Sequence, residues 1–148
     1  MFYFFQEKVD KAEQHASGTN PVVAVHVGLS KDTSVTNGDN IKFDRVILDT
    51  GSYYNVTEGV FVAPVSGAYL LSASICVDNK LWSTGQIIHN GIKVGFFSAG
   101  NTACGNAVAT VVMRGGDRAW LVKVGGNTAN LHEAFGWNTF TANLIAAM

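Results

Sequence analysis

Hydrophobic residues alternate with other residues along most of this sequence, and this period of two limits what the chain can form. Every second residue of 23–29 is Val or Leu, and every second residue of 69–77 is apolar as well. Side chains of a β-strand point alternately to its two faces, so the pattern predicts half-buried strands. Helical spacing is absent after residue 22, and the chain is therefore expected to be all-β.

Further short apolar runs follow, separated by glycine turn signals. The runs cover residues 86–89, 94–97, 107–113, 119–124 and 140–146, and the turn signals are Asn37-Gly38, Asn90-Gly91, Gly115-Gly116 and Gly125-Gly126. Asn-Gly is the strongest short hairpin signal. Many short strands in about 125 residues predict one β-sandwich or jelly roll.

Residues 107–113 are apolar on both predicted faces of their strand. A free antiparallel sandwich usually exposes one polar face of each sheet, so a strand of this kind needs cover on its outer side. Charged residues make up 14% of the chain, against roughly 25% in typical soluble domains. Both observations favour another subunit as the cover.

The first residues have a different pattern from the rest. Apolar residues fall at steps of three and four, as in the seam of a short helix: Phe2, Phe5, Val9, Ala12 and Ala16. We expect residues 1–20 to be the end of an oligomerising helical stalk with its linker, or else a frayed tail, because two heptads are marginal alone. Residues 17–21 break the helix, and residues 21–148 form the globular domain.

Charge and motifs exclude several function classes. A net charge of -1 and the lack of any Lys/Arg cluster exclude nucleic-acid binding, and no apolar run is long enough for membrane insertion. Catalytic and phosphate-binding motifs are missing, so the chain is not expected to be an enzyme. Cys76 and Cys104 leave two alternatives open: two buried free thiols, or one disulfide.

A spaced set of residues in the first half of the domain resembles the signature of the C1q-like family. The matched positions are Phe43, Asp49, Tyr54, Phe61, Gly67 and Tyr69. Two positions depart from it, because Leu71 and Ala73 stand where aromatic residues are expected. The resemblance implies a ten-stranded C1q/TNF-like jelly roll, a homotrimer and secretion. Stand-alone invertebrate members of this kind are linked to innate immune recognition of microbial surfaces and glycans.

Strict antiparallel order sorts the connections between the two ends of such a barrel. Loops 30–40, 78–83, 99–106 and 125–138 are predicted at the end far from the termini, and turns 53–60, 90–92 and 115–117 at the end beside them. Loops on a rigid scaffold often carry binding residues. The candidate ligand-binding residues are Asp78, Asn79, Trp82, Asn127, Asn130, His132, Glu133 and Trp137.

This mixture of residues suits a glycan, because amides and carboxylates hydrogen-bond hydroxyl groups and an aromatic face covers a sugar ring. Two alternatives stay open: a structural role for the loops, and a bound calcium ion with oxygen ligands from Asp39, Asp78 or Glu133. Asn55-Val56-Thr57 is a candidate glycosylation sequon. Pattern recognition is the leading function, with a cytokine-like receptor ligand and an extracellular-matrix structural component as alternatives.

Overall fold

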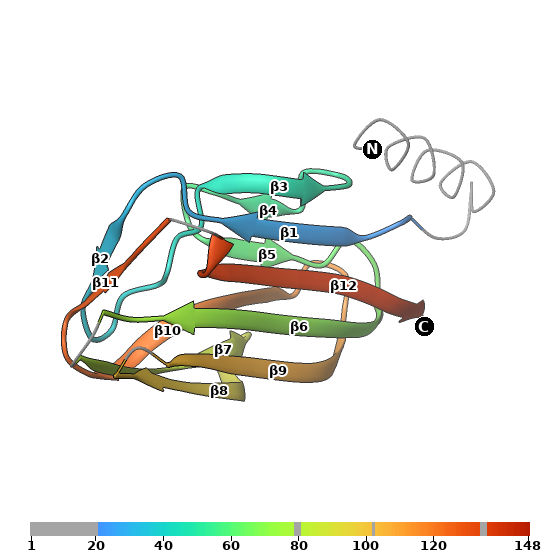
Figure 1. The fold of residues 1–148 in the computed structure, drawn as a ribbon. Coiled ribbons are helices and arrows are strands. Elements are labelled where there is room, and N and C mark those ends of the chain that lie inside the picture. Colours follow the sequence, from blue (N-terminus) through green and yellow to red (C-terminus); the bar gives the residue numbers. More distant parts are fainter. Residues whose placement is uncertain (1–20, 79–80, 102, 134–135) are drawn as a thin grey trace.

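The computed structural model describes residues 21–78, 81–101, 103–133 and 136–148, and the stalk expected at residues 1–20 lies outside them. The described residues form two five-stranded antiparallel sheets and a two-stranded ribbon (Figure 1). The first sheet has the order β3 (Arg45–Asp49), β1 (Ala24–Gly28), β12 (Thr139–Ala147), β6 (Gly67–Cys76), β9 (Cys104–Met113). The second sheet has the order β4 (Tyr54–Asn55), β5 (Val60–Val62), β10 (Arg118–Gly126), β7 (Trp82–His89), β8 (Ile92–Gly100). The ribbon pairs β11 (Ala129–Leu131) with β2 (Thr33–Val35).

These sheets confirm the predicted all-β jelly-roll sandwich, and their ten strands match the predicted number. All seven alternating or apolar runs of the sequence fall on long strands of the two sheets. The faces of β1 are also as predicted, because Val25 and Val27 are buried while Ala24 and His26 are only half-buried. The β2–β11 ribbon is an addition that the sequence pattern did not reveal.

The aromatic signature residues fill the space between the sheets. Phe43, Phe61 and Tyr69 are fully buried, and Phe61 meets Tyr69 edge to face with ring centroids 5.7 Å apart. Phe43 stacks on Phe140 at 6.2 Å. Leu71, where the signature asks for an aromatic residue, is equally buried, so the substitution keeps the position apolar. These residues build the core and are not available to a ligand.

The polar signature residue Asp49 fixes the turn that follows β3. Its carboxylate accepts hydrogen bonds from the backbone amides of Gly51, Tyr53 and Tyr54. The Tyr54 hydroxyl in turn accepts the amide of Phe43 at 3.2 Å, and burial raises the pKa of Tyr54 to about 12. A carboxylate that satisfies three amides explains why this position is acidic.

Gly67 is needed for a close approach of two strands. A Cβ atom at this position would lie 2.5 Å from the carbonyl oxygen of Ala146 on β12, which is too close for any side chain. The residue starts β6 with an ordinary backbone conformation, so it does not supply a tight bend. Its role is to let β6 and β12 pair along their full length.

One predicted turn lies inside a strand. Gly125 and Gly126 belong to β10, where the pairing with β7 shifts register between Lys123 and Gly125. This bulge directs the Gly125 carbonyl toward the buried ammonium group of Lys123, which donates to it at 2.9 Å. Glycines in strands often occur at bulges, and the Gly125-Gly126 pair belongs to a bulge and not to the predicted hairpin turn.

The turns of the sandwich lie at two opposite ends. β1 begins and β12 ends on the right in Figure 1, and we call that end the base and the opposite end the apex. Asn90-Gly91 and residues 114–117 turn at the base, as predicted. The turn before β5 does not, because Val62 pairs with Arg118 at the basal start of β10 and the preceding residues lie further toward the apex.

Candidate functional site

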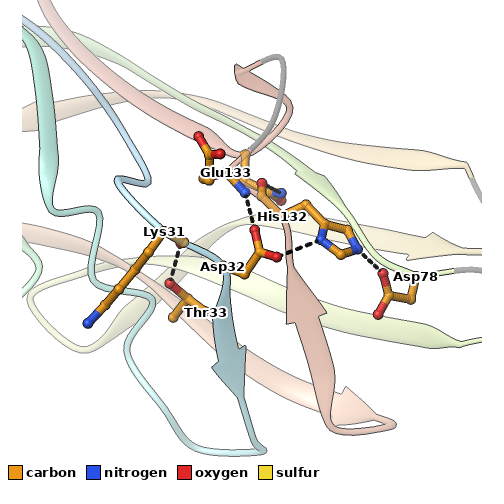
Figure 2. Close-up of polar contacts among 7 residues, drawn as sticks. Lys31, Asp32, Thr33, Asp78, His132 and Glu133 are labelled. Carbon is orange, nitrogen blue, oxygen red and sulfur yellow. Dashed lines mark hydrogen bonds and ion pairs between the residues drawn. The ribbon is translucent and has the colours of Figure 1, made fainter.

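A histidine shared by two carboxylates joins three segments at the apex. His132, which follows β11, contacts Asp32 from the β1–β2 connection through Nδ1 at 3.2 Å. Its Nε2 contacts Asp78, which follows β6, at hydrogen-bond distance. Figure 2 shows the imidazole ring lying between the two carboxyl groups. We call Asp32, Asp78 and His132 the apical cluster.

Backbone and amide hydrogen bonds extend the apical cluster into the sandwich. The amide of Glu133 donates to Asp32 Oδ1 at 3.0 Å. The buried side chain of Asn138 donates from Nδ2 to the carbonyl of His132 at 2.9 Å and accepts the amide of Cys76 at 2.9 Å. The position of His132 is therefore fixed from both its side chain and its backbone.

The charges of the apical cluster stabilise one another. The hydrogen bonds of Asp32 and Asp78 raise the pKa of His132 above its usual value. The amide of Glu133, followed by the ring of His132, lowers the pKa of Asp32. A neighbouring opposite charge favours the charged form of each partner. Both shifts favour an imidazolium held between carboxylates.

A disulfide lies beside the apical cluster. Cys76 ends β6, Cys104 begins β9, and the two residues are direct partners in the sheet register. Their sulfur atoms are bonded, which settles the open alternative in favour of one disulfide. Cys104 is exposed and Cys76 is buried. The bond closes the apical end of the β6–β9 pair.

Two tryptophans are exposed on different segments of the apex, Trp82 at the start of β7 and Trp137 before β12. Trp82 has 53% of its surface exposed, and Trp137 has 46%. Asn127 holds the backbone of Trp82 on both sides, because its side-chain oxygen accepts the Trp82 amide at 3.1 Å and its own amide donates to the Trp82 carbonyl at 2.9 Å. The predicted residues Trp82 and Asn127 are therefore adjacent.

The other predicted ligand-binding residues do not all join these groups. Asn130 lies in β11, where it pairs with Ser34 of β2. Glu133 is exposed beside Asp32, and Asn79 lies outside the described residues. The predicted set thus divides into an acidic part around His132 and an aromatic part around Trp82.

The three residues considered for calcium do not converge. Asp39 accepts the amide and the hydroxyl of Thr36, and Asp78 is engaged by His132. Within the described ranges, no three or more His, Cys, Asp or Glu residues are arranged to hold a metal ion. A polar groove of about 670 Å³ lies near Asp39, between β2 and the turn at Thr57 and Glu58.

Sequence comparison identifies the family of this β-sandwich. The family model described as C1q domain matches residues 24–145, which is most of the described chain. The chain belongs to the C1q domain family. Mouse complement C1q tumor necrosis factor-related protein 2 is 33% identical over 84 residues, covering 55% of this chain, and mouse related protein 9 is 30% identical over 116 residues, covering 74%. The matched regions are 28% and 34% of those relatives, so the chain spans about a third of their length.

Solved structures of the family and of tumour necrosis factors share this fold. The globular domain of zebrafish complement 1qA superposes with a TM-score of 0.72 at 14% identity, covering 86% of this chain and 99% of that one. Eiger TNF from S. frugiperda superposes with a TM-score of 0.70 at 13% identity, covering 87% and 96%. Identities this low relate the folds and carry no information about ligands.

The sequence analysis placed Asp32 and Asn138 in apical loops but did not identify them as site residues. Asp32 was inside the predicted apical loop 30–40, but no pattern marked it as a partner of a histidine 100 residues away. Asn138 resembled any loop amide, and its importance depends on burial that a sequence does not show. Both residues act through pairing between distant segments.

Proposed function

We propose that the chain is the globular part of a secreted homotrimeric recognition protein. Support for a trimer comes from the composition of the first sheet. Four of its five strands, β1, β6, β9 and β12, contain no Asp, Glu, Lys or Arg. Val108 and Val112 on its outer face are 63% and 61% exposed in the single chain. Exposed apolar residues on strands without charged side chains are typical of a surface that another subunit covers.

A truncation and two substitutions test the trimer. A chain without residues 1–20 is expected to stay trimeric, because burial between sheets should outweigh two helical heptads. Val108→Lys should give monomers by sedimentation, whereas Val124→Lys on the second sheet should not. A folded monomer from the truncated chain would show that the stalk makes the trimer.

The apical loops are proposed to bind microbial glycans or other repeated surface ligands in innate immunity. Trp82 and Trp137 are exposed aromatic residues of the apex, and the apical segments also carry the hydrogen-bond acceptors Asp78 and Glu133. Sugar rings bind through this combination of stacking and hydrogen bonding. Three copies of a weak site supply avidity for a repeated ligand.

A glycan array on the purified trimer, with and without calcium, tests the ligand. Trp82→Ala should reduce binding at least about tenfold if the ring stacks on the sugar. Ile92→Ala is the matched control, because Ile92 is an exposed apolar residue at the base. Lack of binding to sugars, lipopolysaccharide and peptidoglycan would exclude this ligand class.

A cytokine-like ligand of a cell-surface receptor is the second candidate. Its support is the fold shared with Eiger TNF and the relatives named as tumor necrosis factor-related proteins. One saturable protein receptor on cells, with no glycan preference, would favour it.

A structural component of the extracellular matrix would instead show higher-order assembly through the stalk. All three proposals involve binding without catalysis.

A further inference from the structure

The apical cluster places one imidazole ring where only its protonated form can donate to both neighbours. A neutral imidazole carries one N–H, and its second nitrogen is an acceptor. In this structure both ring nitrogens of His132 face carboxylate oxygens, one from Asp32 and one from Asp78. A carboxylate has no proton to donate, so a neutral ring would lose one contact.

The two carboxylates belong to segments that are far apart in sequence. Asp32 lies in the connection from β1 to β2, and Asp78 follows β6. His132 is therefore a bridge between two apical loops, and the Glu133 amide adds a second bond to the Asp32 side. Losing one ring contact would free one loop from the bridge.

Among the residues that the structure describes around the ring, no other charged group replaces this bridge. Figure 2 shows the Lys31 side chain and the Glu133 carboxylate pointing away from the ring. Within the described part of the two loops, the charged groups that face His132 are Asp32 and Asp78. Neighbouring segments contribute the neutral Asn138 amide, which bonds the His132 carbonyl.

We propose that protonation of His132 locks the apical loops and that its deprotonation releases them. This regulation would act on the apical loops that are proposed to bind the ligand, so its role in ligand binding rests on the proposed function. The pKa of His132 is raised, so the lock is complete below the ordinary histidine value near 6.5 and is lost as pH rises through the raised value.

Amide hydrogen exchange of the full chain without any ligand tests the lock. The amides of Glu133, bonded to Asp32, and of Leu81, bonded to the Asp78 carbonyl, report the two loops. After correction for intrinsic exchange, their protection should fall about two- to tenfold between pH 6 and pH 8.5. In His132→Gln, protection should be low at both pH values.

His89→Gln is the matched control. His89 contacts a single carboxylate, Asp117, at the base, so replacing His89 should leave the pH response of the apex unchanged.

Asp78→Asn keeps the side-chain shape and should lower the pKa of the His132 ring in an NMR titration. Unchanged apical protection across this pH range in the wild type, or an unshifted His132 titration, would overturn the proposal. Both measurements are independent of glycan binding.

A separate observation concerns the exposed edge of the second sheet. Asn55 ends the edge strand β4, and residues 55–58 are all exposed. Its Oδ1 accepts the amides of Thr57 and Glu58 at 2.9 and 3.0 Å, so the Nδ2 atom points away from the backbone. Asn55-Val56-Thr57 is the one Asn-x-Ser/Thr sequon in the sequence.

We infer that Asn55 carries an N-linked glycan over this edge, provided that the chain enters the secretory pathway. The donor class is a lipid diphosphate-linked oligosaccharide. A bond forms between Asn55 Nδ2 and the sugar anomeric carbon, the bond from that carbon to the phosphate oxygen breaks, and the amide proton leaves with the diphosphate. A bulky polar group also protects a sheet edge from pairing with other chains.

The inference is tested by fusing a known signal peptide to the N-terminus of the full chain and secreting the protein from a eukaryotic host. Intact mass should exceed the chain mass and return to it, plus one dalton for Asn55→Asp, after peptide N-glycosidase treatment. Thr57→Ser should keep the glycan and Thr57→Ala should lose it. Unmodified Asn55 in secreted wild-type protein would overturn the inference, whatever ligand the apex binds.

Discussion

The apex and the base of the sandwich are held together by different interactions. At the base, short turns bring β-strands back on themselves, and backbone groups satisfy one another: Gly116 donates to Ala63, and Asn90 donates to Arg118. At the apex, backbone bonds such as that from Asn101 to Leu81 also occur, but a disulfide and the side chains of the apical cluster add contacts between distant segments. The base therefore depends mainly on its short turns, with added side-chain contacts from Asp117 and Asn90, whereas the apex depends more on chemistry that pH and redox conditions can change.

This difference suits the proposed recognition function. In the proposed trimer, short turns at the base would keep the sheets in register for subunit contacts, and the connections at the apex present exposed groups such as Trp82 and Trp137. Loops held by a few side-chain contacts can also change without disturbing the core. The predictions below test whether the two ends are as independent as their contacts indicate.

The largest effect is expected from removing the disulfide. Cys76→Ala with Cys104→Ala opens a loop with a sequence separation of 28, and the loss should be about 3–4 kcal/mol of unfolding free energy. Urea unfolding of the double variant measures it. Hydrogen exchange should rise beside Cys76 and Cys104 while the turn at 114–117 stays protected. Equal loss of protection at both ends would show that apex and base open together.

A smaller effect is expected from Asn138→Ala. The substitution leaves the buried Cys76 amide without its acceptor, which should cost about 1–3 kcal/mol and loosen the apical cluster. Asn90→Gly is the matched change at the base, because glycine tolerates the positive φ of this residue while Arg118 N–H loses an acceptor but stays near water. That variant should lose less than about 1 kcal/mol. A reversed order in thermal or urea unfolding would contradict the comparison.

The same contrast explains what sequence could predict. The seven long strands followed from period-two alternation and burial, which are local properties. β2, β4, β5 and β11 have two or three residues each, too few for a period to be visible. β3 is mostly exposed, so its residues do not alternate between core and solvent.

The basal turn at Asn90-Gly91 was predictable because two adjacent residues determine its conformation. Asn90 and Gly91 both have positive φ, as a tight hairpin turn requires. At the apex, sequence placed Asp78, His132 and Glu133 in neighbouring loops, and the structure brings Asp78 and His132 into contact. The direct pairing depends on the spacing and tilt of β6 and β11, which local patterns do not encode.

The smallest expected effect is the response of the base to acid. The amide of Arg114, followed by His89 and Asn90, lowers the pKa of Asp117 to about 2. A lowered carboxyl pKa contributes stability above the ordinary value near 3.8, and that contribution is lost as pH falls from there toward 2. Asp117→Asn should remove this acid response while preserving the turn.

Exchange of the Arg114 amide, which donates to Asp117 at 2.9 Å, is the measurement. Its protection should be constant from pH 5 to pH 8, because no contact of the Asp117 carboxylate with a backbone amide changes there, and should fall below pH 4. The apical amide of Glu133 should also weaken in acid, since the pKa of Asp32 is lowered, but it should weaken at alkaline pH as well, when His132 loses its proton. One-sided pH dependence at the base and two-sided dependence at the apex would separate the two ends. Identical profiles would mean that the two ends unfold as one unit, despite their different contacts.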